Sequence, residues 1–123
     1  MILLDSNIVI YLTQPGNEVL YDYFSAKVVQ ASIISYVEVL GFHGITDEDK
    51  VVIEAFFEIT PILPLSTEIA DRAVRLRQTR KIGLGDSLIA ATAIENDLIL
   101  ATHNTADFAW IESLNLIDPL GIG

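Results

Sequence analysis

The chain has 123 residues, which suits one compact domain, and it has no cysteine, which excludes disulfide frameworks, thiolate metal sites and cysteine nucleophiles. Its two histidines, His43 and His103, lie far apart in the sequence, so a histidine-rich metal site is excluded too. Seven basic and 17 acidic residues give a net charge of −10, so net charge alone attracts no nucleic acid. No apolar run approaches the ~20 residues of a membrane span. With 51% hydrophobic residues, we expect a cytoplasmic globular domain with spare apolar surface.

The first quarter of the chain alternates a short apolar run with helix-start signals. Met1–Leu4 predicts a strand, and Asp5-Ser6-Asn7 directly after it predicts the start of a helix over Ile8–Leu12. Asn17 is a suitable cap for a second helix that reaches Ser25. A strand followed closely by helices is the first half of a unit that builds parallel sheets.

The same alternation continues in the next segment. Val28–Ser32 predicts a second strand, and Ile33–Phe42 predicts a helix that ends at Gly44. Thr46 is then expected to cap an amphipathic helix. Its predicted buried face consists of Val51, Val52, Ala55, Phe56 and Ile59.

The second half of the chain repeats the pattern. Pro61–Leu65 predicts a third strand, and Ser66 opens a long helix to about Lys81. Gly83-Leu84-Gly85 is expected to break the chain before a helix that runs to about Asn96. A fourth strand at Leu98–Thr102, a short helix near Asp107 and an edge strand at Leu116–Ile117 complete the series. The sequence therefore predicts a parallel sheet with helices on both faces, whose functional site lies beyond the C-terminal ends of the strands.

Two carboxylates in the first third of the chain stand where plain surface acids are not expected. Asp5 follows four apolar residues at the C-terminal end of the first strand, although a helix N-cap explains an aspartate there as well. Glu38 is the only charged residue in Ile33–Phe42, so it needs a partner, either an ion pair or water at the edge of the helix.

Two further carboxylates occupy comparable positions in the second half. Asp86 opens a helix that is apolar nearly all round, where capping and the helix dipole favour an aspartate in any case. Asp107 lies just beyond the fourth strand, where an aspartate is also ordinary turn chemistry. Carboxylates that converge cannot all ionise without a cation, and an all-oxygen site without histidine or cysteine selects Mg²⁺ or Mn²⁺. Phosphodiesters are the substrates that fit such a site best.

Four segments, taken together, resemble the PIN-domain ribonucleases, and most of all the VapC-type toxins of toxin–antitoxin pairs. The resemblance spans nearly the whole chain, with the motifs in the order in which that family has them. The segments are Leu4-Asp5-Ser6-Asn7, Ser35-Tyr36-Val37-Glu38, the run from Gly85-Asp86 to Ala93, and the run from Leu100 to Phe108.

The resemblance implies a single PIN domain over residues 1–123, a three-layer α/β/α fold with a central, mainly parallel sheet of four to five short strands. It also implies an endoribonuclease that hydrolyses RNA phosphodiester bonds with water activated by Mg²⁺ or Mn²⁺, a homodimer and a partner antitoxin. By the same resemblance Asp5, Glu38, Asp86 and Asp107 form the acidic metal site, and Ser6, Asn7 and Thr102 support it. Thr102 also fits this role chemically, since it ends a strand with a hydroxyl. Gly85 departs from the family pattern, which commonly has a better helix former there.

Five of the seven basic residues lie within one predicted helix and its end. Glu68–Arg72 and Asp71–Arg75 have the spacing of stabilising pairs on one helix. Arg77, Arg80 and Lys81 have no such partner, so they are candidates for RNA contact, although the end of a helix favours cations anyway.

Two other classes of function compete with the toxin. A PIN-like nuclease without an antitoxin would have the same site, and a non-catalytic acidic binding or signalling module would have the same charges. A phosphoacceptor receiver domain needs paired acids after its first strand and a lysine at the end of its last. Here Asp5 stands alone before Ser6, and Leu98–Thr102 ends without lysine. Metal-dependent cleavage of RNA is the property that separates a nuclease from these modules.

Overall fold

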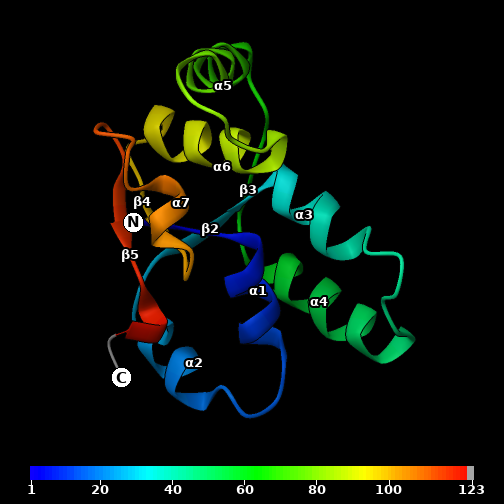
Figure 1. Cartoon of the computed structure of the whole chain (residues 1–123). Helices are drawn as coiled ribbons and strands as arrows, with labels where there is room; N and C mark the ends of the chain where they lie inside the picture. The colour runs from blue at the N-terminus through cyan, green and yellow to red at the C-terminus, as the bar shows by residue number, and fades with distance from the viewer. Residues whose placement is uncertain (122–123) are drawn as a thin grey trace.

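The centre of the molecule is a parallel sheet of five short strands (Figure 1). The computed structural model describes residues 1–121, so the last two residues of the predicted domain lie outside the described part. The strands are β1 (Ile2–Leu4), β2 (Val29–Ser32), β3 (Ile62–Leu63), β4 (Ile99–Ala101) and β5 (Asn115–Ile117). They lie in the order β3-β2-β1-β4-β5, and each neighbouring pair is parallel. The prediction of a mainly parallel sheet is confirmed.

Helices cover both faces of this sheet and make three layers. Successive residues of a strand point to opposite faces, so Leu3 packs in one hydrophobic cluster while Ile2 and Leu4 pack in another. The cluster around Ile2 and Leu4 includes residues of α1 (Ser6–Thr13), α2 (Glu18–Ser25), α3 (Ile33–Leu40) and α4 (Asp47–Ile59). The cluster around Leu3 includes residues of α5 (Thr67–Thr79), α6 (Leu84–Glu95) and α7 (Thr105–Phe108). A 3₁₀ turn, Pro119–Gly121, follows β5. The predicted three-layer α/β/α architecture is confirmed.

α6 is the most enclosed of these helices. Its small residues Ala90, Ala91 and Ala93 are fully buried, and α5 packs against it on the side away from the sheet (Figure 1). A helix between two layers needs apolar residues on both sides, which explains why its sequence is apolar nearly all round. The position of α6 is therefore determined by packing from two directions.

The predicted caps are correct at two helices. The hydroxyl of Thr46 accepts a hydrogen bond from the amide of Asp49 at 3.1 Å, and that of Ser66 accepts one from the amide of Ile69 at 3.1 Å. Asn17 occupies the N-cap position of α2, but its side chain makes no cap hydrogen bond to that helix and donates instead to the carbonyl of Tyr11, in the last turn of α1, at 2.9 Å.

Three predicted helix boundaries need correction. α3 ends at Leu40 and α5 at Thr79, each two residues before the predicted end. The predicted break at Gly83-Leu84-Gly85 is wrong in part, because α6 begins at Leu84. Gly83 alone is outside the helix, as its extended N-cap residue, and Gly85 lies inside the first turn.

The predicted buried face of α4 is wrong except at Phe56, which is partly buried and packs on the cluster around Ile2 and Leu4. Ile53 and Phe57 are buried, whereas Val51, Val52 and Ile59 are exposed, Ile59 to 84%. Both sides of this helix carry apolar residues, and the spacing of apolar residues in the sequence predicted the side with more of them as the buried one. α4 therefore presents apolar side chains to solvent in the isolated chain.

None of the helices formed by residues 1–121 is both long and apolar enough to cross a membrane.

The corrected face of α4 predicts a sharp difference between two isoleucines of one helix. Ile53→Ala removes a buried side chain and should lower the free energy of unfolding by about 2–4 kcal/mol. Ile59→Ala removes an exposed one and should change it by less than about 0.5 kcal/mol. Urea denaturation of the two variants measures this difference. A larger loss for Ile59→Ala would mean that the helix packs through the face predicted from sequence.

Candidate active site

Asp5 lies at the junction of β1 and α1 with its carboxylate almost fully buried. It is the N-cap residue of α1, and its Oδ1 accepts a hydrogen bond from the amide of Ser6 at 2.8 Å. Its Oδ2 accepts one from the hydroxyl of Thr102, at the end of β4, also at 2.8 Å. Thr102 is itself fully buried and accepts a bond from the amide of Asn104 at 3.1 Å. The two explanations for Asp5, a helix N-cap and a functional carboxylate at the end of a strand, are therefore compatible, because one buried carboxylate can serve as both.

Glu38 is held by a short chain of hydroxyl groups. The Oγ of Ser6 lies 2.8 Å from Glu38 Oε1 and 2.9 Å from the Oγ of Ser35. An ionised carboxylate only accepts hydrogen bonds, so Ser6 donates its single proton to Glu38. Ser35, which is fully buried, must then donate to Ser6. The sequence left an ion pair or water at the edge of the helix as alternatives for Glu38. In the described part of the chain the structure shows neither an ion pair nor burial: Glu38 is exposed and accepts a hydrogen bond from Ser6.

Asp86 lies in the first turn of α6 without capping it. The N-cap is Gly83, and no side chain makes a cap hydrogen bond at this end. Among residues 1–121 the carboxylate of Asp86 has no hydrogen-bond donor. The capping explanation for this aspartate is therefore wrong, although the helix dipole still favours a negative charge in its first turn.

Asp107 is exposed in the first turn of α7, the short helix that follows β4. Its backbone amide donates to the carbonyl of Asn104 at 3.0 Å, and Asn104 is in turn held by Thr102. The loop between β4 and α7 is thereby tied to the Asp5–Thr102 pair, which places Asp107 at the same edge of the sheet.

The four carboxylates act on one another electrostatically. Burial raises the pKa of Asp86 above its ordinary value of 3.8, and the negative charges of Asp5, Asp107 and Glu38 raise it further. Burial also raises the pKa of Asp5, against the lowering effect of the bonds from Thr102 and Ser6, and Asp107 adds to the rise. Asp86 is thus within electrostatic range of the other three acidic residues that the sequence singled out.

Their side chains are close enough to repel but are not gathered around one point. Within residues 1–121, no group of three or more histidine, aspartate or glutamate side chains is arranged to hold a metal ion as it stands. The carboxylate of Glu38 is turned onto Ser6. Coulombic repulsion acts over longer distances than the ~2.1 Å of a magnesium–oxygen bond. The raised pKa of Asp86 and the lack of a ready metal site among the described residues therefore agree.

A model of the PIN domain family matches residues 2–112, which is most of the chain. The chain belongs to the PIN-domain family. Among curated proteins, none matches it significantly.

Solved structures agree with this assignment. The chain is similar to a protein in a toxin–antitoxin complex from Klebsiella pneumoniae, with 31% identity, a TM-score of 0.81 and coverage of 97% of this chain and 98% of that one. It is also similar to VapBC-1 from nontypeable Haemophilus influenzae, with 28% identity, a TM-score of 0.81 and coverage of 98% and 99%. DNA-bound VapBC from Salmonella typhimurium shares the fold at 22% identity, with a TM-score of 0.85 and coverage of 96% and 97%. The resemblance to VapC-type PIN-domain toxins is confirmed.

The supporting polar residues of this PIN domain fall into two groups. Ser6 and Thr102 bond directly to Glu38 and Asp5, as their predicted role requires. Asn7 is exposed, and its side chain makes no hydrogen bond in the part of the chain that the structure describes. The structure therefore joins Ser6 and Thr102 to the carboxylates and leaves Asn7 apart from them.

The basic residues of α5 are arranged differently from the predicted pairs. Arg72 pairs with Glu95 of α6, with Nη2 and Oε2 2.7 Å apart, and not with Glu68. For the described residues, Asp71 and Arg75 form no ion pair. Tertiary packing of α5 on α6 offers Arg72 a carboxylate that no spacing within one helix could reveal.

Two residues near Glu38 were not singled out from sequence for a role in the site. Ser35 precedes Glu38 by three positions, so both lie on one face of α3, but its burial comes from tertiary contacts. Gly85 lies against the carboxylate: a Cβ atom built there would come 2.6 Å from Glu38 Oε2. The glycine that departs from the family pattern is therefore the residue that leaves room for Glu38.

The close approach of Gly85 to Glu38 predicts that Gly85→Ala preserves the stability of the fold but weakens metal binding. Alanine is better than glycine inside a helix by about 0.5–1 kcal/mol, so the free energy of unfolding should not fall. The added methyl group must push the Glu38 carboxylate away from α6 and from Ser6. We therefore expect Mn²⁺ affinity, measured by calorimetry, to fall by about 10- to 100-fold.

Gly83→Ala is the matched control for this change. A Cβ atom at Gly83 meets nothing within 4 Å, so no side chain has to move. Equal Mn²⁺ affinities of the two variants would show that the space at Gly85 has no bearing on the carboxylates.

Proposed function

We propose that this PIN-domain protein is a divalent-metal-dependent endoribonuclease and acts as the toxin of a toxin–antitoxin pair in the cytoplasm. The observation that carries the proposal is the position of the half-buried carboxylate of Asp86: burial raises its pKa, and the charges of Asp5, Asp107 and Glu38 around it raise the pKa further. A bound cation would remove the repulsion among these charges. Because the acids are not accompanied by histidine or cysteine ligands, a hard ion such as Mg²⁺ or Mn²⁺ fits the donor set.

Asp5, Glu38, Asp86 and Asp107 are the residues that would hold this ion. When bound, it supplies an activated water for attack on phosphorus and neutralises charge on the phosphate oxygens. Asp5 is kept in one orientation by Ser6 and Thr102, each on a different oxygen, while further lone pairs remain on both oxygens. Ser6 also orients Glu38, so one hydroxyl-bearing residue contacts two of the four carboxylates.

The assignment as a toxin rests on the family and on its solved relatives. The similar protein from Klebsiella pneumoniae is part of a toxin–antitoxin complex, and the sequence of this chain matches nearly the whole length of that protein. A small DNA-binding protein encoded directly upstream would support the same assignment here. Its absence would favour a PIN-like nuclease without an antitoxin.

The decisive experiment is incubation of the purified, partner-free protein with structured RNA. We expect cleavage with Mg²⁺ or Mn²⁺ and none with excess EDTA, because the four residues proposed to hold the ion are all carboxylates and bring no thiol or imidazole to activate water instead. Undiminished cleavage in EDTA would remove the metal from the mechanism. Absence of cleavage under all conditions would favour a non-catalytic binding or signalling module.

Asp86→Asn should abolish cleavage without harming the fold. The pKa of Asp86 is raised in the folded state, so the wild-type protein loses stability as pH rises from 3.8 through the raised pKa. Asparagine carries no charge and lacks this loss. In EDTA at neutral pH the variant should therefore unfold at the same temperature as the wild type or higher.

Excess Mn²⁺ should reverse this order, because only the wild type gains the full binding energy of the ion. Thermal melts in EDTA and in Mn²⁺, beside the cleavage assay, test both statements. A variant that cleaves RNA at the wild-type rate would contradict the proposed site.

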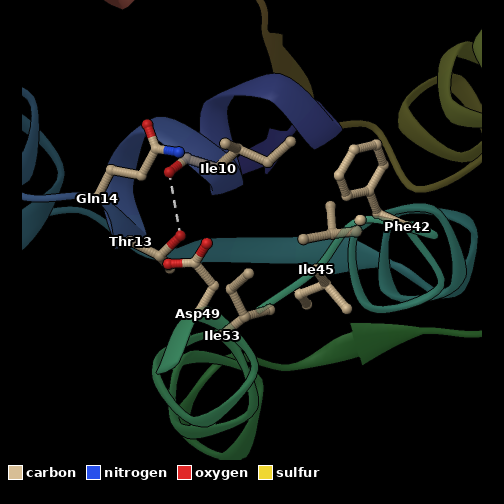
Figure 2. A pocket seen from close by; sticks show the side chains of 9 residues that line it. Ile10, Thr13, Gln14, Phe42, Ile45, Asp49 and Ile53 are labelled. Carbon is tan, nitrogen blue, oxygen red and sulfur yellow. Dashed lines mark hydrogen bonds between the residues drawn. The ribbon is translucent and has the colours of Figure 1, made fainter. Parts of the chain in front are cut away.

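We further propose that protein partners cover the apolar surface. A pocket of about 260 Å³ opens between α1, the α3–α4 loop and α4 (Figure 2). Phe42, Ile45 and Ile10 line one part of it, and Thr13 and Asp49 lie together at another. An antitoxin with apolar side chains would fit this pocket, and a second copy of the chain would cover further exposed apolar residues such as those of α4.

This surface predicts that the purified protein is a homodimer or carries a bound partner. Apolar side chains as exposed as Ile59 and Phe42, at 84% and 64%, favour association in water. Light scattering at micromolar concentration measures the mass directly. A monodisperse monomer would contradict the proposed partners.

A further inference from the structure

The strong negative charge of the protein leaves substrate binding unexplained. RNA is a polyanion, and a chain with a net charge of −10 repels it unless cations lie close to the site. Of the candidate cations at the end of α5, Arg77 is engaged, because its Nη1 donates to the carbonyl of Ile82 at 3.1 Å. Within the described residues, the side chains of Arg80 and Lys81 form no hydrogen bond or ion pair.

Arg80 has instead an aromatic neighbour from another part of the chain. Its guanidinium carbon lies 5.6 Å from the centre of the Trp110 ring, within the range of a cation–π contact. Arg80 is the residue directly after α5 and has an extended backbone, which turns the chain away from the helix axis. The two residues come from elements on the same face of the sheet.

Trp110 ties this pair to α7. Its Nε1 donates to the backbone carbonyl of Asp107 at 3.0 Å, so the ring is fixed against the helix that carries the fourth carboxylate. The ring is partly buried and packs on the hydrophobic cluster around Leu3. A cation and an anchored aromatic ring therefore lie at the end of α7, the helix that carries Asp107.

We propose that Arg80 and Trp110 form a contact site for an unpaired nucleotide of single-stranded RNA, at the end of the helix that carries Asp107; this inference rests on the proposed function. The guanidinium donors lie at its edge, so Arg80 can bind a phosphate while it contacts the ring. The planar guanidinium over the ring and the part of the indole that remains exposed offer a flat surface on which a base stacks. Paired bases are not accessible for such stacking, so the site favours unpaired RNA.

The single tryptophan of the chain makes the inference directly testable. Indole fluorescence reports on Trp110 alone and should be quenched when a base stacks on it. The probe is a random-sequence single-stranded RNA pool of about ten nucleotides, a length suited to such grooves. Ca²⁺ replaces Mg²⁺ as a hard cation, and gel electrophoresis verifies that the RNA stays intact. We expect quenching by the single-stranded pool and little by a blunt RNA duplex.

Variants at Arg80 separate the contact from general charge. Arg80→Ala should weaken binding about tenfold and lower the salt dependence of log Kd by about 0.7, the value of one phosphate contact on a single strand. Arg80→Lys keeps the charge but lacks the planar fork, so it should recover only part of the affinity. Arg75→Ala removes the same charge from the exposed side of α5 and is the matched control.

Trp110→Phe keeps an aromatic face but loses the hydrogen bond to Asp107. Because this variant lacks the indole, its affinity for RNA is measured by the fluorescence anisotropy of labelled RNA. We expect weaker binding than in the wild type but stronger than in Trp110→Leu. If Arg80→Ala and Arg75→Ala have equal affinity, salt dependence and quenching while the wild type cleaves RNA, this inference is overturned and the proposed function stands. If the wild type neither binds nor cleaves RNA, both are overturned.

Discussion

The buried carboxylate of Asp5 is the contact on which the rest of the site depends. This carboxylate caps α1 by accepting a hydrogen bond from the amide of Ser6, and it accepts a second one from the hydroxyl of Thr102. The backbone amide of Asp5 donates to the carbonyl of Ala101. A buried charge is costly unless it is hydrogen-bonded, and here each oxygen has a donor. Because Thr102 also holds Asn104, the path from β4 into α7 depends on the same group. Loss of this carboxylate would thus release Ser6 and Asp107 together.

The four carboxylates come from both layers of helices. Glu38 lies on α3, and Asp5 begins α1, on one side of the sheet; Asp86 and Asp107 lie on α6 and α7, on the other. A cation held by all four would therefore contact helices from both layers. In that case stability and metal binding would be linked, since any ion that prefers the folded site stabilises it.

Local patterns were sufficient to predict much of this molecule. The caps at Thr46 and Ser66 and the parallel sheet follow from residues adjacent in sequence or from motifs in a known order. The assignment of the four acidic residues as a metal site stays a prediction. The failures have a common cause in tertiary contacts. α4 has apolar residues on two sides, and only its packing against α1 and α3 selects Ile53 and Phe57. Arg72 prefers Glu95 of a neighbouring helix, and Ser35 acquires its role only when α1 approaches α3.

The enclosure of α6 between the sheet and α5 has a genetic consequence. A selection for inactive variants would recover two kinds of substitution along this one helix. Replacement of Ala90, Ala91 or Ala93 by larger residues would disrupt packing on two sides and lower the amount of protein in the cell. Replacement of Asp86, one turn before, would leave that amount unchanged. Protein abundance would therefore separate the alanines that pack the helix from Asp86, whose proposed role is in the site.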